Sequence, residues 1–176
     1  MAARAVLSDA DITRALTRIS HEILEANRGA ADLVILGIPT RGSVLAERIA
    51  AIIETIEPGA ATHGSLDVTM YRDDLSRQPI RASAPTQIPD GGIDGKTVVL
   101  VDDVLYSGRT IRAALDAIGA IGRPRAVRLA VLVDRGHREL PIRADYVGKN
   151  LPSSVQERVN VRLASVDGAE EVTIEA

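Results

Sequence analysis

The sequence predicts an α/β fold, with an open and mostly parallel sheet flanked by helices. Short apolar runs alternate with amphipathic stretches along the whole chain. The run at 98–101 is continuously apolar and mostly β-branched, which is typical of a strand with both faces covered. No linker or repeat divides the 176 residues, so we expect a single domain over 1–176.

The first elements in the chain are two helices separated by a strand. Ser8, followed three residues later by Asp11, predicts a capped helix start. Apolar residues then recur at helical spacing, at Ile12, Leu16, Ile19 and Ile23. An apolar strand follows at 33–38, and the residues at 39–42 turn the chain into a second helix.

The middle of the chain predicts a less regular region. Leu66, Val68 and Met70 alternate with polar residues, which indicates a strand with one polar face or a place near an edge. Residues 72–96 contain many Pro, Gly, Asp and Ser residues, and we expect a long loop or a protruding hairpin there. Further strands are predicted at 98–101, 126–133, 144–147, 159–164 and 172–174, with a helix after the first of them.

Composition excludes several classes of protein. The 45% hydrophobic content fits a globular chain, and no apolar run approaches the ~20 residues that cross a bilayer. The first nine residues lack the features of a signal peptide, so we expect a soluble, cytoplasmic protein without a membrane partner. The absence of Cys excludes disulfides and thiolate metal sites.

Charge and aromatic content restrict how the protein could bind nucleic acid. A net charge of −3 provides no general attraction, so binding to RNA would require a local basic patch. The chain has three Tyr and neither Phe nor Trp, which argues against a platform for base stacking.

The run VVLVDDVLYSGRT at 98–110 joins a strand to two acids, a loop and a helix. Ligands of open α/β sheets bind beyond the carboxyl ends of strands, where Asp102 and Asp103 could meet sugar hydroxyls or a hydrated Mg²⁺. Gly108 allows close backbone approach, and the helix start offers N–H groups to a phosphate. The alternative is that the acids only end a strand and cap a helix.

A second motif, GIPTRG at 37–42, also follows a strand. Since parallel strand ends face one crevice, Thr40 and Arg41 should lie across from the two acids, with Arg41 able to bind a diphosphate in bidentate fashion. Arg72, at the mouth of the long loop, could join them. An ordinary turn and a solvated charged hairpin are the respective alternatives.

The run at 98–110 resembles the motif by which type I phosphoribosyltransferases bind 5-phosphoribosyl-1-pyrophosphate (PRPP). The resemblance implies a flexible loop at 72–96, a small C-terminal hood at 140–176 and a cis peptide often found in the 37–42 loop. It implies catalytic roles for Asp102, Asp103 and Arg41, with Mg²⁺ held by the two acids through water. The implied PRPP and nucleotide site consists of Thr40, Arg41, Arg72, Asp102, Asp103, Val104, Leu105, Tyr106, Ser107, Gly108, Arg109 and Thr110.

Four segments narrow the resemblance: 15–22, 68–76, 98–110 and 133–150. They are similar to the bifunctional uracil phosphoribosyltransferases that regulate bacterial pyrimidine operons. That implies transfer of ribose 5-phosphate to uracil, giving UMP and pyrophosphate, with uracil held by Asp134, Arg135, His137 and Val159. Purine-salvage relatives have an Asp, proposed as a base, where this chain has Tyr106. A Tyr with a pKa near ~10 is a poor base at neutral pH, so no general base is assigned.

The same resemblance implies binding of a pyrimidine-operon leader RNA, tightened by UMP or UTP. Arg14, Arg18 and His21 share a helix face opposite the apolar stripe, although Glu22 and Glu25 interrupt it. A solvated face or a subunit contact is the alternative. The implied RNA-binding set is Arg14, Thr17, Arg18, His21, Arg28 and Lys149. Because one such face is small, we expect a homodimer or a higher oligomer.

Three functional hypotheses follow. The first is a uracil phosphoribosyltransferase that also regulates through RNA. The second is an RNA-binding regulator whose transferase site is only a nucleotide pocket. The third is a purine or orotate phosphoribosyltransferase, which Tyr106 and the segment at 133–150 disfavour.

Overall fold

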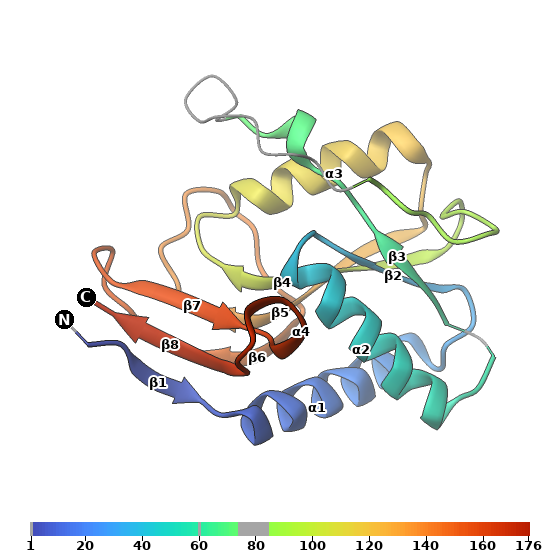
Figure 1. Ribbon diagram of the computed structural model, residues 1–176. Helices are drawn as coiled ribbons and strands as arrows, with labels where there is room; N and C mark the ends of the chain where they lie inside the picture. Colours follow the sequence, from blue (N-terminus) through green and yellow to red (C-terminus); the bar gives the residue numbers. More distant parts are fainter. Residues whose placement is uncertain (1, 60, 74–84) are drawn as a thin grey trace.

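A parallel sheet in the order β3-β2-β4-β5-β6 forms the centre of the computed structural model, which describes residues 2–59, 61–73 and 85–176 (Figure 1). Neighbouring strands pair in parallel throughout, as the alternation of strands and helices predicts. The strands are β2 (Leu33–Gly37), β3 (Thr62–Ser65), β4 (Thr97–Leu105), β5 (Ala126–Asp134) and β6 (Tyr146–Asn150).

Helices cover both faces of this sheet. α1 (Asp9–Asn27) and α2 (Arg41–Ile56) lie on one face, and α3 (Arg109–Ile121) lies on the other (Figure 1). In β4, Val99 and Val101 belong to the hydrophobic cluster under α1 and α2, whereas Val98 and Leu100 belong to the cluster under α3. The continuous apolar run is thus buried on both faces, and the predicted α/β fold is confirmed.

The start of α1 has the capping box that the sequence predicts. The backbone N–H of Asp11 donates to Ser8 Oγ at 3.2 Å, and the backbone N–H of Ser8 donates to Asp11 Oδ2 at 2.9 Å. These bonds satisfy N–H groups that have no partner inside the helix. The four stripe residues Ile12, Leu16, Ile19 and Ile23 are each at most 1% exposed.

A second, antiparallel sheet in the order β1-β8-β7 lies beside the first (Figure 1). It contains β1 (Arg4–Leu7), β7 (Arg158–Arg162) and β8 (Glu171–Glu175), and the short helix α4 (Ala164–Asp167) connects the last two. The predicted hood therefore differs in composition, because β6 joins the parallel sheet and the N-terminal strand completes the antiparallel one. The four residues of β1 do not alternate between apolar and polar types, so the sequence pattern does not predict this strand.

The predicted strand through Leu66, Val68 and Met70 is wrong. β3 ends at Ser65, and Thr69–Tyr71 form the 3₁₀ helix η1. The Asp67 carboxylate accepts bonds from the Thr69 N–H at 3.0 Å and the Thr69 hydroxyl at 2.7 Å. This side-chain turn competes with strand pairing, and Met70 is left 73% exposed.

The predicted long loop falls partly outside the described residues, at 74–84. Within the remainder of it, Gln87 pairs with Ser65 as an isolated antiparallel bridge, and Ile93 is 2% exposed in the cluster under α3. The described part of this loop is therefore attached to the rest of the protein at Gln87 and at Ile93. Across the described ranges, none of the helices combines the length and apolar character that a membrane span requires.

Candidate active site

Asp102 and Asp103 lie in the last half of β4, where the strand has lost one neighbour. β2 pairs with β4 only as far as Gly37 and Val101, whereas β5 continues to pair until Leu105 and Asp134. The acids are thus inside the strand rather than beyond its end, which corrects the prediction. The shorter β2 leaves one side of β4 open at this corner of the sheet.

The two carboxylates occupy different environments. Asp102 is 8% exposed and accepts the backbone N–H of Asp103 at 2.9 Å, and Asp103 accepts the N–H of Val104 at 2.8 Å. Burial raises the pKa of Asp102 well above its ordinary value, and the neighbouring Asp103 carboxylate raises it further. A cation or a ring of hydroxyl donors at this corner would relieve both effects.

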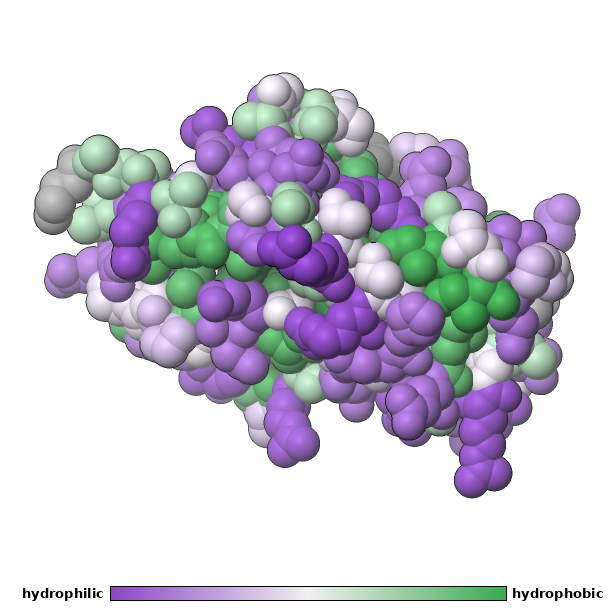
Figure 2. All heavy atoms as spheres, turned by 90° about the horizontal axis from the view of Figure 1, so that it is seen from below, coloured by the Kyte–Doolittle hydropathy of each residue, from purple (hydrophilic) through white to green (hydrophobic). Residues whose placement is uncertain are grey.

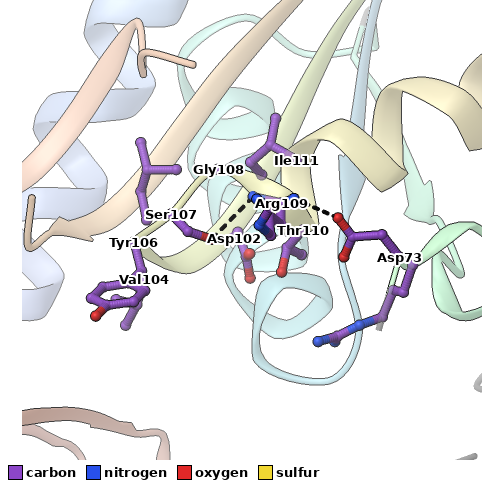
Figure 3. A pocket seen from close by; sticks show the side chains of 11 residues that line it. Asp73, Asp102, Val104, Tyr106, Ser107, Gly108, Arg109, Thr110 and Ile111 are labelled. Carbon is purple, nitrogen blue, oxygen red and sulfur yellow. Dashed lines mark hydrogen bonds and ion pairs between the residues drawn. The ribbon is translucent and has the colours of Figure 1, made fainter. Parts of the chain in front are cut away.

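A hollow of about 270 Å³ lies between this corner and the start of α3 (Figure 3). Gly108 has a φ of 94°, and a Cβ there would come within 3.1 Å of the Ile142 side chain, so the loop requires glycine. Ser107 Oγ accepts the Arg109 N–H at 3.3 Å. The lining residues are Arg72, Asp73, Asp102, Val104, Leu105, Tyr106, Ser107, Gly108, Arg109, Thr110 and Ile111.

The guanidinium of Arg109 bonds to two acids at the edge of this hollow. Its Nη1 donates to Asp73 at 2.6 Å, and its Nε donates to Glu139 at 3.0 Å (Figure 3 shows the first). Asp73 lies just after η1, and Glu139 belongs to the segment after β5. The Arg109 side chain therefore connects two loops to α3. Its backbone N–H points instead to Ser107, in the loop before α3.

A second hollow of about 340 Å³ adjoins the first and shares Arg72, Asp102, Val104 and Thr110 with it. Its remaining lining comes from Ile38, Pro39, Thr40, Arg41, Asp67, Val68, Thr69 and Asp103. Every residue of the predicted PRPP site therefore lines one of these two hollows. Together they form one crevice across the carboxyl ends of β2 and β4.

The 37–42 loop is pressed against β4. The N–H of Ile38 donates to the Val101 carbonyl at 2.9 Å, and a Cβ at Gly42 would come within 2.5 Å of the same oxygen. Glycine at position 42 thus permits the contact. The peptide bond between Pro39 and Thr40 is cis, in the loop where the resemblance implies one.

The predicted uracil residues after β5 gather around Tyr106. The Arg135 guanidinium carbon lies 4.3 Å from the centre of the Tyr106 ring, and the His137 ring centre lies 5.9 Å from it. His137 Nε2 bonds to the Ser153 carbonyl, which assigns this ring nitrogen a structural contact. Val159 instead packs against the hydrophobic cluster under α1 and α2.

Arg138, which the prediction omitted, connects these groups. Its three nitrogens donate to the carbonyls of Ile142 and Tyr106, each at 2.8 Å, and to the Asp134 carboxylate at 2.6 Å. Asp134 is therefore paired with Arg138 at the end of β5. The sequence showed only neighbouring charges here, and no pattern indicates which Arg turns inward.

The predicted RNA face is exposed on α1. The surface on which α1 lies, seen from below, is mainly hydrophilic (Figure 2). Arg14, Thr17, Arg18 and His21 are all exposed, opposite the buried stripe. Arg28, at the end of α1, and Lys149, in β6, are also exposed.

Arg18 also has a structural contact that the sequence did not predict. Its Nη1 and Nη2 donate to the backbone carbonyls of Val147 at 3.2 Å and Gly148 at 2.6 Å, and Nη1 also pairs with Glu22 at 2.7 Å. Arg18 thus fastens α1 to β6, immediately before Lys149. Arg14 pairs with Asp11 at 2.5 Å.

Residues 4–164 match the family model described as phosphoribosyl transferase domain. The chain belongs to the phosphoribosyl transferase family.

Relatives named Bifunctional protein PyrR are similar along almost the whole chain. The protein of Leifsonia xyli is 71% identical over 99% of this chain and 98% of its own length. That of Streptomyces coelicolor is 66% identical, over 99% and 90%. That of Mycobacterium tuberculosis strain H37Ra is 55% identical, over 97% and 92%.

Solved structures of the same family share the fold at low identity. A hypoxanthine-guanine phosphoribosyltransferase from Bacillus anthracis superposes with a TM-score of 0.70 at 17% identity, with both chains fully covered. A hypoxanthine phosphoribosyltransferase from Staphylococcus aureus gives 0.65 at 20% identity, covering 86% of this chain and 79% of its own. These likenesses show the type I phosphoribosyltransferase architecture. They do not indicate which substrate this chain uses.

Proposed function

We propose that the chain transfers ribose 5-phosphate from PRPP to N1 of uracil, forming UMP and pyrophosphate, and that it regulates pyrimidine genes by binding a leader RNA. The main observation that supports the transferase activity is the single crevice in which the acids of β4, the loop before α3 and the 37–42 loop meet. Full-length similarity to relatives named as bifunctional supports the pairing of two activities.

The two hollows suit the two ends of PRPP. Backbone amides of the loop at 106–110 and the start of α3 would hold the 5-phosphate as a fixed anchor. Thr40, Arg41 and Arg72 line the other hollow, where the diphosphate would lie. Asp102 and Asp103, between them, would accept bonds from the ribose hydroxyls.

The acids also fit a Mg²⁺ ion carried by the substrate. Among the described residues, no group of three or more His, Cys, Asp or Glu side chains could enclose a metal. One or two carboxylates with water and substrate phosphates are the usual Mg²⁺ environment, and Asp102 and Asp103 supply that donor set. When bound, the ion would neutralise charge on the leaving diphosphate.

In the reaction, the bond from ribose C1 to the diphosphate oxygen breaks and a bond from C1 to uracil N1 forms, while a proton leaves N1. The sugar acquires positive charge and the diphosphate negative charge. Arg41, Thr40 and Arg72 would stabilise the leaving group, and the β4 acids would face the sugar. Tyr106, stacked under Arg135, would form a wall of the uracil site beside Asp134 and His137.

A direct assay tests the transferase half. The purified protein is incubated with PRPP, Mg²⁺ and, in turn, uracil, hypoxanthine, guanine and orotate. Of the four bases, we expect only uracil to give a product, namely UMP together with pyrophosphate. Product with a purine or with orotate would assign a different base specificity. UMP binding without any transfer would support the alternative of an RNA-binding regulator with a vestigial transferase site.

The RNA half rests on the exposed residues Arg14, Thr17 and His21 of α1, with Arg28 and Lys149 nearby. We infer that uridine nucleotides in the crevice tighten leader RNA on this face. One such face offers few positive charges, so we also infer a homodimer or a higher oligomer that presents two of them.

A further inference from the structure

A carboxylate from the C-terminal sheet region holds Arg41. Arg41 Nη2 donates to Asp167 Oδ1 at 2.6 Å, and Arg41 Nε donates to Asp167 Oδ2 at 3.1 Å. Asp167 is the last residue of α4, which lies beside the start of α2 although 126 residues separate the pair (Figure 1). The crevice is thus connected to the antiparallel sheet through this ion pair.

The geometry of the pair leaves Arg41 able to bind a second anion. A guanidinium carries five N–H groups, and a carboxylate on the Nε–Nη2 edge engages two of them. The Nη1–Nη2 edge presents another parallel pair of N–H groups, which matches the spacing of phosphate oxygens. Arg41 lines the half of the crevice that also contains Thr40 and Asp103, and its side chain as a whole is 36% exposed.

Asp167 is itself well fixed. Its Oδ2 also accepts the backbone N–H of Leu163 at 2.9 Å, and its side chain is only 18% exposed. The Arg41 hydrogen bond, followed by that from Leu163, lowers the pKa of the Asp167 carboxyl, so the group is charged at neutral pH. A charged acid with two independent partners has little rotational freedom left.

A second ion pair between α2 and the hood lies about two turns further along the same face of α2. Arg48 is seven residues after Arg41 on α2 and pairs with Glu170 at 2.9 Å. Glu170 also accepts a backbone N–H, that of Ala164, at 3.2 Å. Arg48 does not line either hollow. Both ion pairs connect α2 to the hood, but only the pair that contains Arg41 lies at the crevice.

We propose that Asp167 is a positioning residue for phosphoribosyl transfer, which holds the Arg41 guanidinium so that its open edge faces the diphosphate of PRPP. The proposal rests on the function proposed above for the crevice. It predicts that loss of the carboxylate affects ligands carrying a diphosphate more than it affects UMP, which has none.

The test compares Asp167→Asn with Glu170→Gln. Each change removes one negative charge and one ion pair between α2 and the hood, and each leaves an amide oxygen that can still accept the backbone N–H. We expect Asp167→Asn to weaken PRPP binding in the presence of Mg²⁺ about five- to tenfold by calorimetry, and to lower kcat. Its UMP affinity and its KM for uracil should stay within twofold of wild type. Glu170→Gln should leave all four quantities unchanged.

Asp167→Glu is the conservative variant, since it retains the charge on a side chain one methylene longer. We expect it to bind PRPP more tightly than Asp167→Asn does. Thermal unfolding of all three variants checks that each is folded, and Asp167→Glu keeps the test valid should the Asn variant fail to fold.

Several results would overturn the proposal. Equal losses in Asp167→Asn and Glu170→Gln would show that the pair only attaches the hood to α2. Tighter PRPP binding by Asp167→Asn would show that Asp167 competes with the diphosphate for Arg41. The binding experiment needs no uracil, so weaker PRPP binding by Asp167→Asn supports the positioning role even if the wild type makes no UMP, a result that would refute only the proposed function. A wild type that binds no PRPP would refute both.

Discussion

The residues that decide the proposed chemistry are a pair of acids in an unfavourable place. Asp102 is buried beside Asp103 at the open corner of β4, and both burial and its neighbour raise its pKa. Ionisable side chains that are buried beside a like charge, although this costs folding free energy, are frequent at functional sites. A role in binding ligand explains why two carboxylates stand where apolar side chains would pack without this cost.

The double substitution of Asp102→Asn and Asp103→Asn should therefore separate activity from stability. We expect UMP formation to fall by roughly a hundredfold or more, because the ribose hydroxyls and the metal ion would face two neutral amides in place of two negatively charged carboxylates. In EDTA the melting temperature should equal or exceed that of wild type, since the variant no longer buries adjacent carboxylates. Steady-state kinetics and thermal unfolding measure the two effects. Near-normal kcat/KM for PRPP would contradict the assignment.

Arg41 should act on the leaving diphosphate rather than on the nucleotide. We expect Arg41→Ala to lower kcat for UMP synthesis by about tenfold or more while UMP affinity changes little, because UMP lacks the diphosphate. Turnover at saturating substrates and UMP binding by calorimetry provide the comparison. An equal loss in both measurements would place Arg41 at the nucleotide phosphate instead.

At the scale of elements, the capping box of α1 makes a pH-dependent contribution to stability. The hydrogen bond from the Ser8 N–H is the largest cause that lowers the pKa of Asp11 below its ordinary value. A carboxyl with a depressed folded-state pKa stabilises the fold above the unfolded value, and this stabilisation is lost as pH falls through the folded value. The contribution is thus complete at pH 7, begins to decrease as pH falls to the ordinary Asp pKa of ~3.9, and is lost as pH falls further through the lowered pKa of the folded state.

We expect Asp11→Asn to destabilise the protein at pH 7 but to have little effect once wild-type Asp11 is protonated. Ser8→Ala should lower the unfolding free energy by about 1 kcal/mol at pH 7. Urea unfolding of each variant at pH 7 and at a series of acidic pH values provides the data. Asp9→Asn is the matched control, because Asp9 lies in the same first turn outside the box. An equal loss in Asp9→Asn would mean that the helix dipole alone is responsible.

The exposed face of α1 is better tested at Arg14 than at Arg18. Arg18→Ala would remove a predicted RNA contact, but it would also release two backbone carbonyls of β6. Arg14→Gln avoids this, since Arg14 bonds to Asp11 on its own helix.

We expect Arg14→Gln to weaken binding of leader RNA and to reduce the slope of log K against log salt by about 0.7–0.9 per RNA site. Arg162→Gln, in β7, removes another exposed, acid-paired charge away from α1 and should change neither quantity. Filter binding across a range of salt concentrations measures both. Indistinguishable results from the two variants would exclude a specific contact at Arg14.

At the scale of the whole molecule, described contacts connect the crevice to the RNA face. Arg18 joins α1 to β6, and β6 pairs with β5 as far as Asn150 and Asp134. Asp134 begins the segment that surrounds Tyr106. A rearrangement of this segment on nucleotide binding would therefore reach α1 through one strand.

UMP should thus tighten the binding of leader RNA, and RNA must then raise the affinity for UMP by the same factor. The two factors are obtained from RNA titrations with and without UMP and from UMP titrations with and without RNA. UMP that leaves RNA affinity unchanged would show that the two sites are independent.

The sequence by itself determined the features that depend on local spacing. The period of Ile12 to Ile23, the capping box and the run at 98–101 each follow from a helix turn or from burial on two faces, and the structure confirms them. The acids, the glycine at 108 and the 37–42 loop could be placed in one crevice because parallel strand ends share one edge.

Only the tertiary structure decided which distant groups meet. Whether Asp67 turns the chain away from a strand depends on a hydrogen bond that competes with pairing. β1 is a strand because β8 offers it an edge, and four residues without alternation do not by themselves predict one. The contacts of Asp167 with Arg41, of Arg138 with Tyr106 and of Arg18 with β6 join residues that lie far apart in the chain or whose rotamers the fold selects. Long polar side chains take the partner that packing brings within reach, and no spacing along the sequence encodes that choice.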